Sequence, residues 1–228
     1  MTSSATMQPA AFQRILRTLR RAYGPLPVAR PEPPLDVLIQ TILSQNTSDL
    51  NSLRAYRSLR RQFPRWSQVA AASEAEIASA IHSGGLARIK AARIRQVLQI
   101  IHAPGGRAAL RRLKKMDQAQ ALSWLTSLPG VGVKTASCVL LFALGLPAMP
   151  VDTHVYRLVI RLGWVAPRQS VAAVTAALEK LIPARMIRPL HLYLIEHGRR
   201  ICRPQRPACD QCVLRPDCVW VIHNAPSA

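Results

Sequence analysis

At residues 128–134 the chain reads Leu-Pro-Gly-Val-Gly-Val-Lys, with segments of helical periodicity on either side. Gly130 and Gly132 allow a tight turn whose amide groups face outward, and the following helix adds its N-terminus. Such amides bind anions, and a phosphate of the DNA backbone is the natural occupant. A Gly-x-Gly turn also fits a simple helix connector, so the turn alone leaves both interpretations open.

Lys134 follows at the start of the next helix. The helix dipole disfavours a cation at this end, so a lysine beside a phosphate-binding turn suggests a purpose other than helix stability. The alternative interpretation is an ordinary solvated surface charge. We therefore treat Lys134 as a candidate reactive amine.

The composition limits the size of the core and the kind of partner. The chain has 228 residues, 49% of them hydrophobic, enough for one large core or two small ones. Its formal net charge of +20 indicates a phosphate backbone or an anionic membrane surface, and we favour nucleic acid. The longest apolar run, Cys138–Val151, is broken by Gly145, Pro147 and Pro150 and is shorter than the roughly 20 residues that span a bilayer. No transmembrane helix is expected.

The segments between the Pro and Gly breaks almost all carry helical periodicity, which predicts an all-α fold. A short N-terminal tail leads into a helix whose apolar face includes Phe12 and Leu19, and Gly24–Pro34, with five prolines, predicts an extended connector. Further helices are expected at about Leu35–Leu43, Asp49–Phe63, Val69–Ser79, Lys90–His102, Asp117–Ser127, Lys134–Leu144, Thr153–Leu162, Val171–Leu181 and Pro189–Arg199.

Four cysteines are crowded near the C-terminus: Cys202, Cys209, Cys212 and Cys218. Four thiolates this close can surround a zinc ion or a 4Fe–4S cluster. Only one Cys-x-x-Cys pair is present, whereas structural zinc usually uses two, which favours iron–sulfur; four unligated thiols are the third possibility. The crowding is unlike the disulfide framework of a secreted domain, so an intracellular home is expected. Cys138 is interpreted as a core residue.

Asp152 stands just before an apolar helix, where a helix N-cap is the ordinary explanation. Capping is compatible with catalysis, because a carboxylate held by helix amides stays anionic at neutral pH. An anion is what a sugar with developing oxocarbenium character requires nearby.

These motifs together resemble endonuclease III of the helix-hairpin-helix DNA glycosylase superfamily. The resemblance runs from about Leu35 to Cys218 and rests on Leu-Pro-Gly-Val-Gly-Val-Lys-Thr-Ala, on Val-Asp-Thr-His-Val and on the Cys-x6-Cys-x2-Cys-x5-Cys tail. It implies two helical lobes: a six-helix barrel with the helix-hairpin-helix at residues 25–146, and an iron–sulfur cluster lobe formed by residues 1–24 and 147–228. The four cysteines would bind the 4Fe–4S cluster.

The resemblance also implies a reaction on double-stranded DNA with a damaged base or abasic site. Lys134 matches the nucleophilic lysine and Asp152 the catalytic aspartate of a bifunctional glycosylase and abasic-site lyase, which excises oxidised pyrimidines in base excision repair. The neutral amine would attack C1′ of a flipped nucleotide, and the resulting Schiff base would permit β-elimination. A monomer in the cytoplasm, associated with the nucleoid, is expected.

Family members fill the hole left by the flipped base with a glutamine and an apolar wedge. Asn46 stands at the glutamine position and is one methylene shorter, with Gln45 as a possible substitute, and Leu86 matches the wedge. Ala87 replaces a larger residue expected beside the wedge. The alternative is that Leu86 is core and Asn46 a helix cap.

Three further residues resemble family positions close to DNA: His154, Arg203 and Arg206. Two other functions remain open. A monofunctional mismatch glycosylase would share the fold and cluster, but such relatives generally lack the lysine at the position of Lys134. A non-catalytic DNA-binding module would use the hairpin for phosphate and the cysteines for structural zinc.

Overall fold

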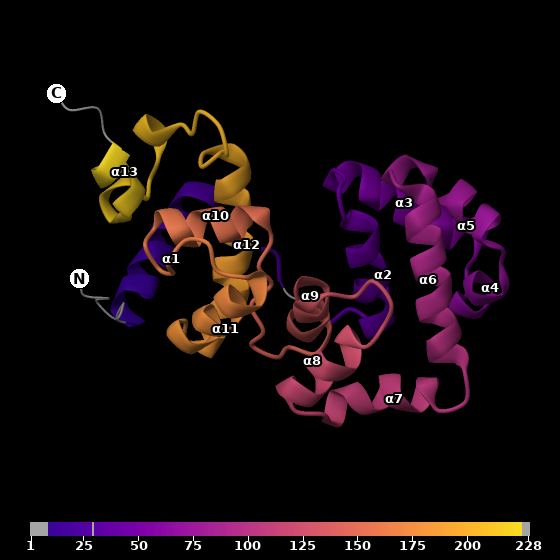
Figure 1. The fold of residues 1–228 in the computed structure, drawn as a ribbon. Helices are drawn as coiled ribbons and strands as arrows, with labels where there is room; N and C mark the ends of the chain where they lie inside the picture. The colour runs from indigo at the N-terminus through magenta and orange to yellow at the C-terminus, as the bar shows by residue number, and fades with distance from the viewer. Residues whose placement is uncertain (1–8, 29, 225–228) are drawn as a thin grey trace. The chain divides into compact units, whose positions relative to one another are not determined.

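A computed structural model describes residues 9–28 and 30–224, so the predicted N-terminal tail lies outside the described residues. All regular elements in these two ranges are helical, which confirms the all-α prediction. The described chain divides into two compact units, one within Pro31–Leu146 and one formed from Met1–Arg30 together with Pro147–Ala228. Figure 1 labels the helices of each unit. None of the described helices has the length and apolarity needed to cross a bilayer.

The Pro31–Leu146 unit is built around one helix that is buried on nearly all sides. Helix α2 has seven buried residues out of eleven and packs against α3, α6 and α9. Each fully buried Leu or Ile contributes about 1.5–3 kcal/mol relative to an exposed one, so α2 is the centre of this core. The elements of the unit are α2 (Pro34–Ser44), α3 (Asp49–Gln62), α4 (Trp66–Ala71), α5 (Glu74–Ala80), η1 (His82–Gly84), α6 (Ala87–His102), α7 (Gly106–Arg112), η2 (Leu113–Lys115), α8 (Gln118–Thr126) and α9 (Val133–Ala143).

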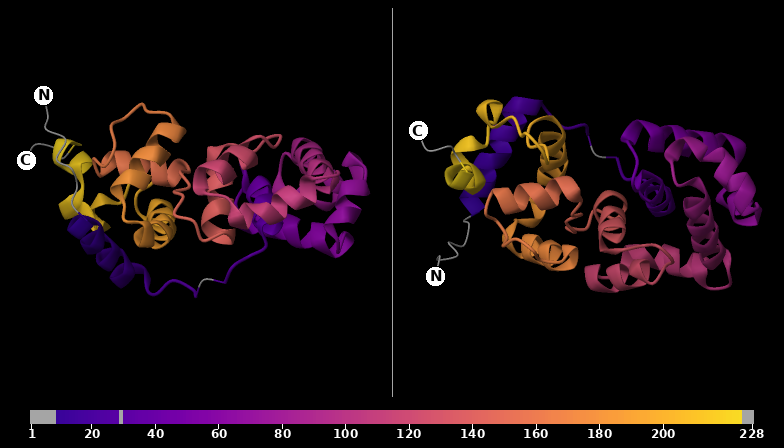
Figure 2. Two further views of the ribbon diagram at one scale, coloured as in Figure 1. Left: turned by 90° about the horizontal axis from the view of Figure 1, so that it is seen from below. Right: turned by 45° about the horizontal axis from the view of Figure 1, so that its top comes forward.

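The other unit joins the two ends of the chain. Figures 1 and 2 show α1, in indigo, beside the yellow C-terminal segment, and Arg14 of α1 forms an ion pair of 2.6 Å with Asp217. Phe12 of α1 packs edge-on against Trp164, with ring centroids 4.9 Å apart. The elements of this unit are α1 (Pro9–Tyr23), α10 (Thr153–Arg161), α11 (Val171–Leu181), α12 (Ala184–Arg200), η3 (Cys209–Gln211), η4 (Arg215–Asp217) and α13 (Val219–Asn224).

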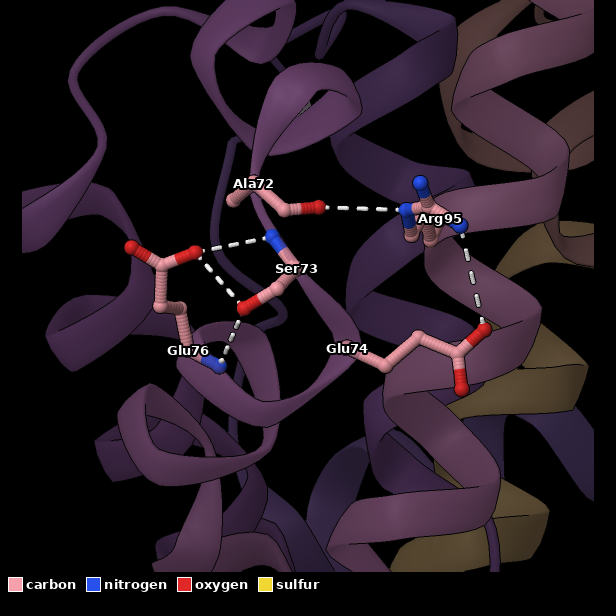
Figure 3. A network of polar contacts seen from close by, with 5 residues as sticks. All are labelled: Ala72, Ser73, Glu74, Glu76 and Arg95. Atoms are coloured by element: carbon pink, nitrogen blue, oxygen red, sulfur yellow. Dashed lines mark hydrogen bonds and ion pairs between the residues drawn. The ribbon is translucent and has the colours of Figure 1, made fainter.

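The single helix predicted at Val69–Ser79 is wrong, because Ser73 divides it into α4 and α5. Figure 3 shows the cause: Oε2 of Glu76 accepts hydrogen bonds from the backbone amide and hydroxyl of Ser73, and Ser73 Oγ accepts from the Glu76 amide. This reciprocal capping box starts a new helix at Glu74. From α6, Arg95 donates to the Ala72 carbonyl over 3.1 Å, which fixes the break.

Helix α12 begins five residues earlier than the sequence predicted, at Ala184, with Pro189 inside it. A proline inside a helix removes one backbone hydrogen bond and usually marks a helix start. Here Met186, Ile187 and Leu190 are buried on both sides of the proline, so packing holds the helix together across the missing bond. Helices α7 and α13 were not predicted, because both are short and lack a clear apolar period.

Candidate active site and cysteine loop

The hairpin between α8 and α9 forms the turn that the sequence predicted. Gly130 has φ +71°, and the Val131 amide donates to the Leu128 carbonyl over 3.1 Å. Gly132 is the N-cap of α9 and supplies no side-chain acceptor to the first turn of this helix. The leading amides of α9 are therefore available to an external anion such as a phosphate.

Gly130 is required for a second reason. A Cβ placed on it would lie 2.6 Å from Cδ of Arg93, a side chain of α6. The hairpin therefore packs directly against an arginine, and a larger residue at position 130 would have to displace it.

Lys134 is the second residue of α9 and is half-buried. Cys138 and Phe142 follow at intervals of four, so the three side chains share one face of the helix. That face borders a cavity of about 410 Å³ within the Pro31–Leu146 unit. Its lining residues come largely from α2 and α3, and the surface that they present to the cavity is mainly apolar: Glu32, Val37, Gln40, Thr41, Ser44, Asp49, Ser52, Leu53, Tyr56, Cys138 and Phe142.

The cavity wall contains a fixed hydrogen-bond system. Tyr56 donates its hydroxyl proton to Oδ1 of Asp36 over 2.8 Å, and burial together with this carboxylate raises the pKa of Tyr56 to about 12. Gln40 donates to Oε2 of Glu32 over 3.2 Å. The wall therefore combines a mainly apolar surface with a few polar groups held in place by hydrogen bonds, the composition of a pocket for a planar ligand.

Two neighbouring residues of the α2–α3 loop, Gln45 and Asn46, differ in exposure. Gln45 is half-buried: its Oε1 accepts from Nη1 of Arg93 over 3.1 Å, and its Nε2 donates to the Thr135 hydroxyl over 3.4 Å. Asn46 is exposed and has φ +51°. It does not cap α3, because Ser48 does so by accepting from the Asn51 amide over 3.3 Å.

Leu86 lies directly before α6 and is 50% exposed, so it is not a core residue. Its φ of +50° is unusual for a leucine and costs about 1–3 kcal/mol. Such strain tends to be retained where a side chain must project in a particular direction. Ala87 is the first residue of α6.

Asp152 belongs to the other unit and is the N-cap of α10, as the sequence predicted. Its Oδ1 accepts from the Val155 amide over 2.8 Å. Two residues later, Nδ1 of His154 lies 3.2 Å from Nη2 of Arg157. A guanidinium only donates, so Nδ1 is the acceptor and the proton of a neutral His154 is on Nε2.

The four C-terminal cysteines lie in the loop that contains η3 and η4. Cys202 and Cys218 are buried, and Cys209 and Cys212 are half-buried. Burial raises the pKa of Cys212 to about 11, and the charges of the other three cysteines act in the same direction. Because the negative charges of the thiolates repel one another, all four can ionise together only when a cationic centre is bound.

In the part of the chain that the structure describes, no three His, Cys, Asp or Glu side chains converge closely enough to hold a single metal ion. A cubane spreads its four thiolates over four iron atoms, so they need not converge on one point. Four cysteine thiols in one loop are the donor set that a 4Fe–4S cluster takes, and in this chemistry the residues fit.

Sequence reasoning missed the residue that supports this loop. Arg161 of α10 donates to Cys202 Sγ over 3.1 Å and to the Arg203 carbonyl over 2.8 Å, and its guanidinium lies 4.7 Å from the centre of the Trp220 ring. Arg203 and Arg206 are exposed, the latter with φ +48°. No motif marks Arg161, since its partners are backbone carbonyls and a thiol distant in sequence.

His197 of α12 was also missed. Its Nε2 lies 3.4 Å from Cys212 Sγ, and its Nδ1 lies 2.6 Å from the Tyr23 hydroxyl. Burial lowers the pKa of His197 to about 4, so the ring is neutral at pH 7. The cysteine loop is thus joined to α12 and, through Tyr23, to α1.

Known proteins resemble the chain over most of its length. Residues 39–184 match the family described as HhH-GPD superfamily base excision DNA repair protein. Endonuclease III of Thermotoga maritima is 38% identical over 186 residues, covering 81% of this chain and 82% of that protein. Endonuclease III of Sulfolobus acidocaldarius is 30% identical over 189 residues, covering 82% of each.

A solved structure described as a non-covalent endonuclease III–DNA complex superposes with a TM-score of 0.77 at 27% identity, covering 95% of this chain and 98% of that one. A thermostable thymine-DNA glycosylase, 22% identical, shares the fold with a TM-score of 0.76 and covers 94% of this chain and 96% of its own. The chain belongs to the HhH-GPD superfamily of base excision DNA repair proteins and is a DNA glycosylase.

Proposed function

We propose that this glycosylase is bifunctional: it excises oxidised pyrimidines from duplex DNA and then cleaves the strand at the resulting abasic site. The observation that carries the proposal is the position of Lys134. It directly follows a hairpin whose helix amides are available to an anion, and it shares a helix face with two residues that line the cavity. A phosphate held at the hairpin would bring a deoxyribose to the amine, and the cavity would receive the extruded base.

The reaction begins when the unprotonated amine of Lys134 attacks C1′ of the flipped nucleotide. The glycosidic C1′–N bond breaks, its electron pair leaves with the base, and the departing base takes up a proton. Asp152 is assigned to stabilise the positive charge that develops on the sugar, and a carboxylate that accepts a helix amide is well suited to stay ionised.

The sugar ring then opens and the lysine nitrogen becomes the iminium nitrogen of a Schiff base. A proton leaves C2′, its electron pair forms a C2′–C3′ double bond, and the C3′–O bond breaks with departure of the phosphate-bearing strand. Water hydrolyses the imine and restores the free lysine. One amine therefore serves both steps.

We assign the 4Fe–4S cluster to Cys202, Cys209, Cys212 and Cys218. When bound, the cluster supplies a rigid cross-link rather than chemistry at the sugar. The loop that it would hold carries Arg203 and Arg206, which are exposed and suited to DNA phosphates. His154, Gly130 and Gly132 are proposed as further contacts to the DNA backbone.

The proposal is tested by sodium borohydride trapping on a duplex that contains one thymine glycol or one abasic site. Borohydride reduces the imine and leaves a stable protein–DNA adduct. We expect an adduct with the native chain and none with Lys134→Ala. Lys180→Ala, an exposed lysine of α11, is the matched control and should trap normally. Absence of an adduct with folded, iron-loaded native protein on both substrates would reject the bifunctional mechanism.

A further inference from the structure

One charged side chain of the Pro31–Leu146 unit is buried without any role in the proposed reaction. Lys90, in the first turn of α6, is 1% exposed. Its ammonium group donates to the Leu43 carbonyl over 2.7 Å and to the Gly84 carbonyl over 2.8 Å. Burying an ammonium group is costly, and a methionine of similar length would fill the same space without that cost. The two hydrogen bonds therefore need a functional explanation.

The two carbonyls belong to segments far apart in the sequence. Leu43 is in the last turn of α2, where carbonyls lack partners within the helix, and it precedes Asn46 by three residues. Gly84 ends the 3₁₀ helix η1 and precedes Leu86 by two residues. The buried Lys90 thus connects the two segments that lead to the exposed residues Asn46 and Leu86.

Both of these exposed residues have a left-handed backbone, with φ +51° at Asn46 and φ +50° at Leu86. Such a conformation persists in residues other than glycine only where the surroundings fix it. The ammonium group of Lys90 can fix both conformations, because it binds a carbonyl shortly before each residue and so restrains both segments at once. Both carbonyls lie at the C-terminal ends of helices, where a cation is stabilising.

A second side chain on the same face of α6 reinforces this arrangement. Arg93, three residues after Lys90, donates to Gln45 and covers Gly130 of the hairpin. α6 therefore holds the last turn of α2 through the Leu43 carbonyl and the α2–α3 loop through the Gln45 side chain. α6 thus fixes the position of this loop.

We propose that Lys90 is a positioning residue that sets the spacing between Asn46 and Leu86, so that both enter the base stack when the target nucleotide is flipped out. This inference rests on the proposed function. Lys90 touches neither DNA nor the reacting atoms; it acts through the two segments that it joins. Its contribution is needed only where a stacked duplex must be opened.

Single-stranded DNA with an abasic site separates the reaction of the Lys134 amine from the opening of the base stack. It has no stack to open, so trapping on it depends on Lys134 but not on the two filling residues. Excision of thymine glycol from a duplex depends on all of them. We expect Lys90→Met to lower the single-turnover rate of base release from duplex by about 10- to 100-fold, the effect of a small misplacement. Trapping on the single strand should stay within about twofold of the native rate.

Arg95→Met is the matched control. Arg95 also lies on α6 and also donates to the backbone carbonyl of a loop, that of Ala72, as Figure 3 shows. That loop joins α4 to α5 and bears neither filling residue. Arg95→Met should therefore leave both activities unchanged. An equal loss of duplex activity in the two variants would overturn the inference, because any broken loop contact would then suffice.

Two further measurements exclude a merely structural role. Hydrogen exchange followed by mass spectrometry should show faster exchange in peptides covering residues 43–48 and 84–88 of Lys90→Met, with peptides of α8 unchanged. The double variant Lys90→Met with Leu86→Ala should be no slower on duplex than the slower single variant. Fully additive rate losses, or unchanged exchange in the two segments, would overturn the inference.

If Lys90→Met does not fold, Lys90→Gln provides the same test, because its amide still donates but reaches less far. It should show a smaller loss confined to duplex DNA, and an equal loss on both substrates would count against the positioning role. Failure of the proposed function has a different signature: the native chain itself would give no adduct on the single-stranded abasic DNA.

Discussion

Arg93 and Gln45 are joined by a hydrogen bond of 3.1 Å from Nη1 to Oε1, which holds the glutamine side chain against α6. The amide nitrogen Nε2 of Gln45 donates to the Thr135 hydroxyl, so both polar atoms of its side chain are engaged within the unit. Gln45 is therefore poorly placed to substitute for its exposed neighbour Asn46 in a base stack. We therefore assign Asn46 as the side chain that fills the space left by the flipped base.

Asn46→Ala should slow base release from a thymine glycol duplex by about 10-fold, since truncation removes contacts to the opposite base worth roughly 1.4 kcal/mol. Gln45→Ala should instead lower the free energy of unfolding by about 1 kcal/mol, through lost hydrogen bonds, with a smaller effect on rate. Single-turnover kinetics and urea unfolding measure the two quantities. A larger rate loss in Gln45→Ala would reverse the assignment.

Gly130→Ala should destabilise the hairpin and weaken DNA binding. The alanine meets two obstacles, a φ of +71° and the Arg93 Cδ at 2.6 Å. Gly145→Ala is the matched control: its φ is +68° and the space around it is open, so it carries only the conformational cost of about 1 kcal/mol. The excess loss in Gly130→Ala, read from unfolding curves, should disappear when Arg93→Ala is added. Equal losses at the two glycines would contradict the close approach of Arg93.

Lys90 gives the stability of the protein a predictable pH dependence. Burial lowers its pKa from 10.5, so the unfolded chain binds more protons than the folded chain between the lowered pKa and 10.5. Stability due to this group therefore rises with pH across that window and is lowest below it. The unfolding free energy of the native chain minus that of Lys90→Met should therefore increase as pH rises. The subtraction removes the contributions of titratable groups that both proteins share. A difference that does not change with pH would contradict the burial of a charged amine at position 90.

The cysteine loop predicts a metal content. Purified native chain should contain about four iron atoms and an equal amount of acid-labile sulfide, the composition of a cubane. Cys212→Ser should lose most of the iron and the visible absorbance, whereas Cys138→Ala should keep both, because Cys138 belongs to α9 and is not one of the four cysteines assigned to the cluster. One zinc per chain with no iron would support the alternative of a structural zinc site.

Most features that depend on residues close together in the chain were predicted from the sequence. The hairpin glycines, Lys134 at a helix start and Asp152 as an N-cap were all readable, because each depends on near neighbours in the chain. The break at Ser73 was readable too, since Ser-x-x-Glu is a capping box, but the helical period across Val69–Ser79 concealed it. A local rule was present and the longer pattern outweighed it.

Lys90, Arg93 and Arg161 could not be found in this way. Each donates to backbone carbonyls or to side chains that tertiary folding brings close, and their own sequence surroundings suggest ordinary charged helix positions. In α6, Lys90 differs from its exposed neighbour Arg88 only by facing the core. Long-range partners of this kind leave no signal in the spacing of residues, so the structure was needed to identify the side chains that hold the loops.

Asp152 combines a structural and a proposed catalytic role, and one substitution separates them. Asn caps a helix about as well as Asp, so Asp152→Asn should keep the bond to the Val155 amide and change stability by no more than about 0.5 kcal/mol. It removes the negative charge, however, and should slow base release by about 100- to 1,000-fold, the scale of losing one electrostatic stabiliser. Asp152→Ala should lose the cap as well and destabilise the chain by about 1 kcal/mol.

Asp117 supplies the control for this test. It is the N-cap of α8, and its Oδ1 accepts from the Gln120 amide over 2.8 Å, the same distance as in the Asp152 cap. Asp117→Asn therefore makes the same change of charge at another N-cap with a hydrogen bond of equal length, at a residue with no proposed part in the reaction. Base release and unfolding free energy should both stay close to native. If Asp152→Asn and Asp117→Asn proved equally active, capping would account for Asp152 in full, and the positive charge on the sugar would need another stabilising group.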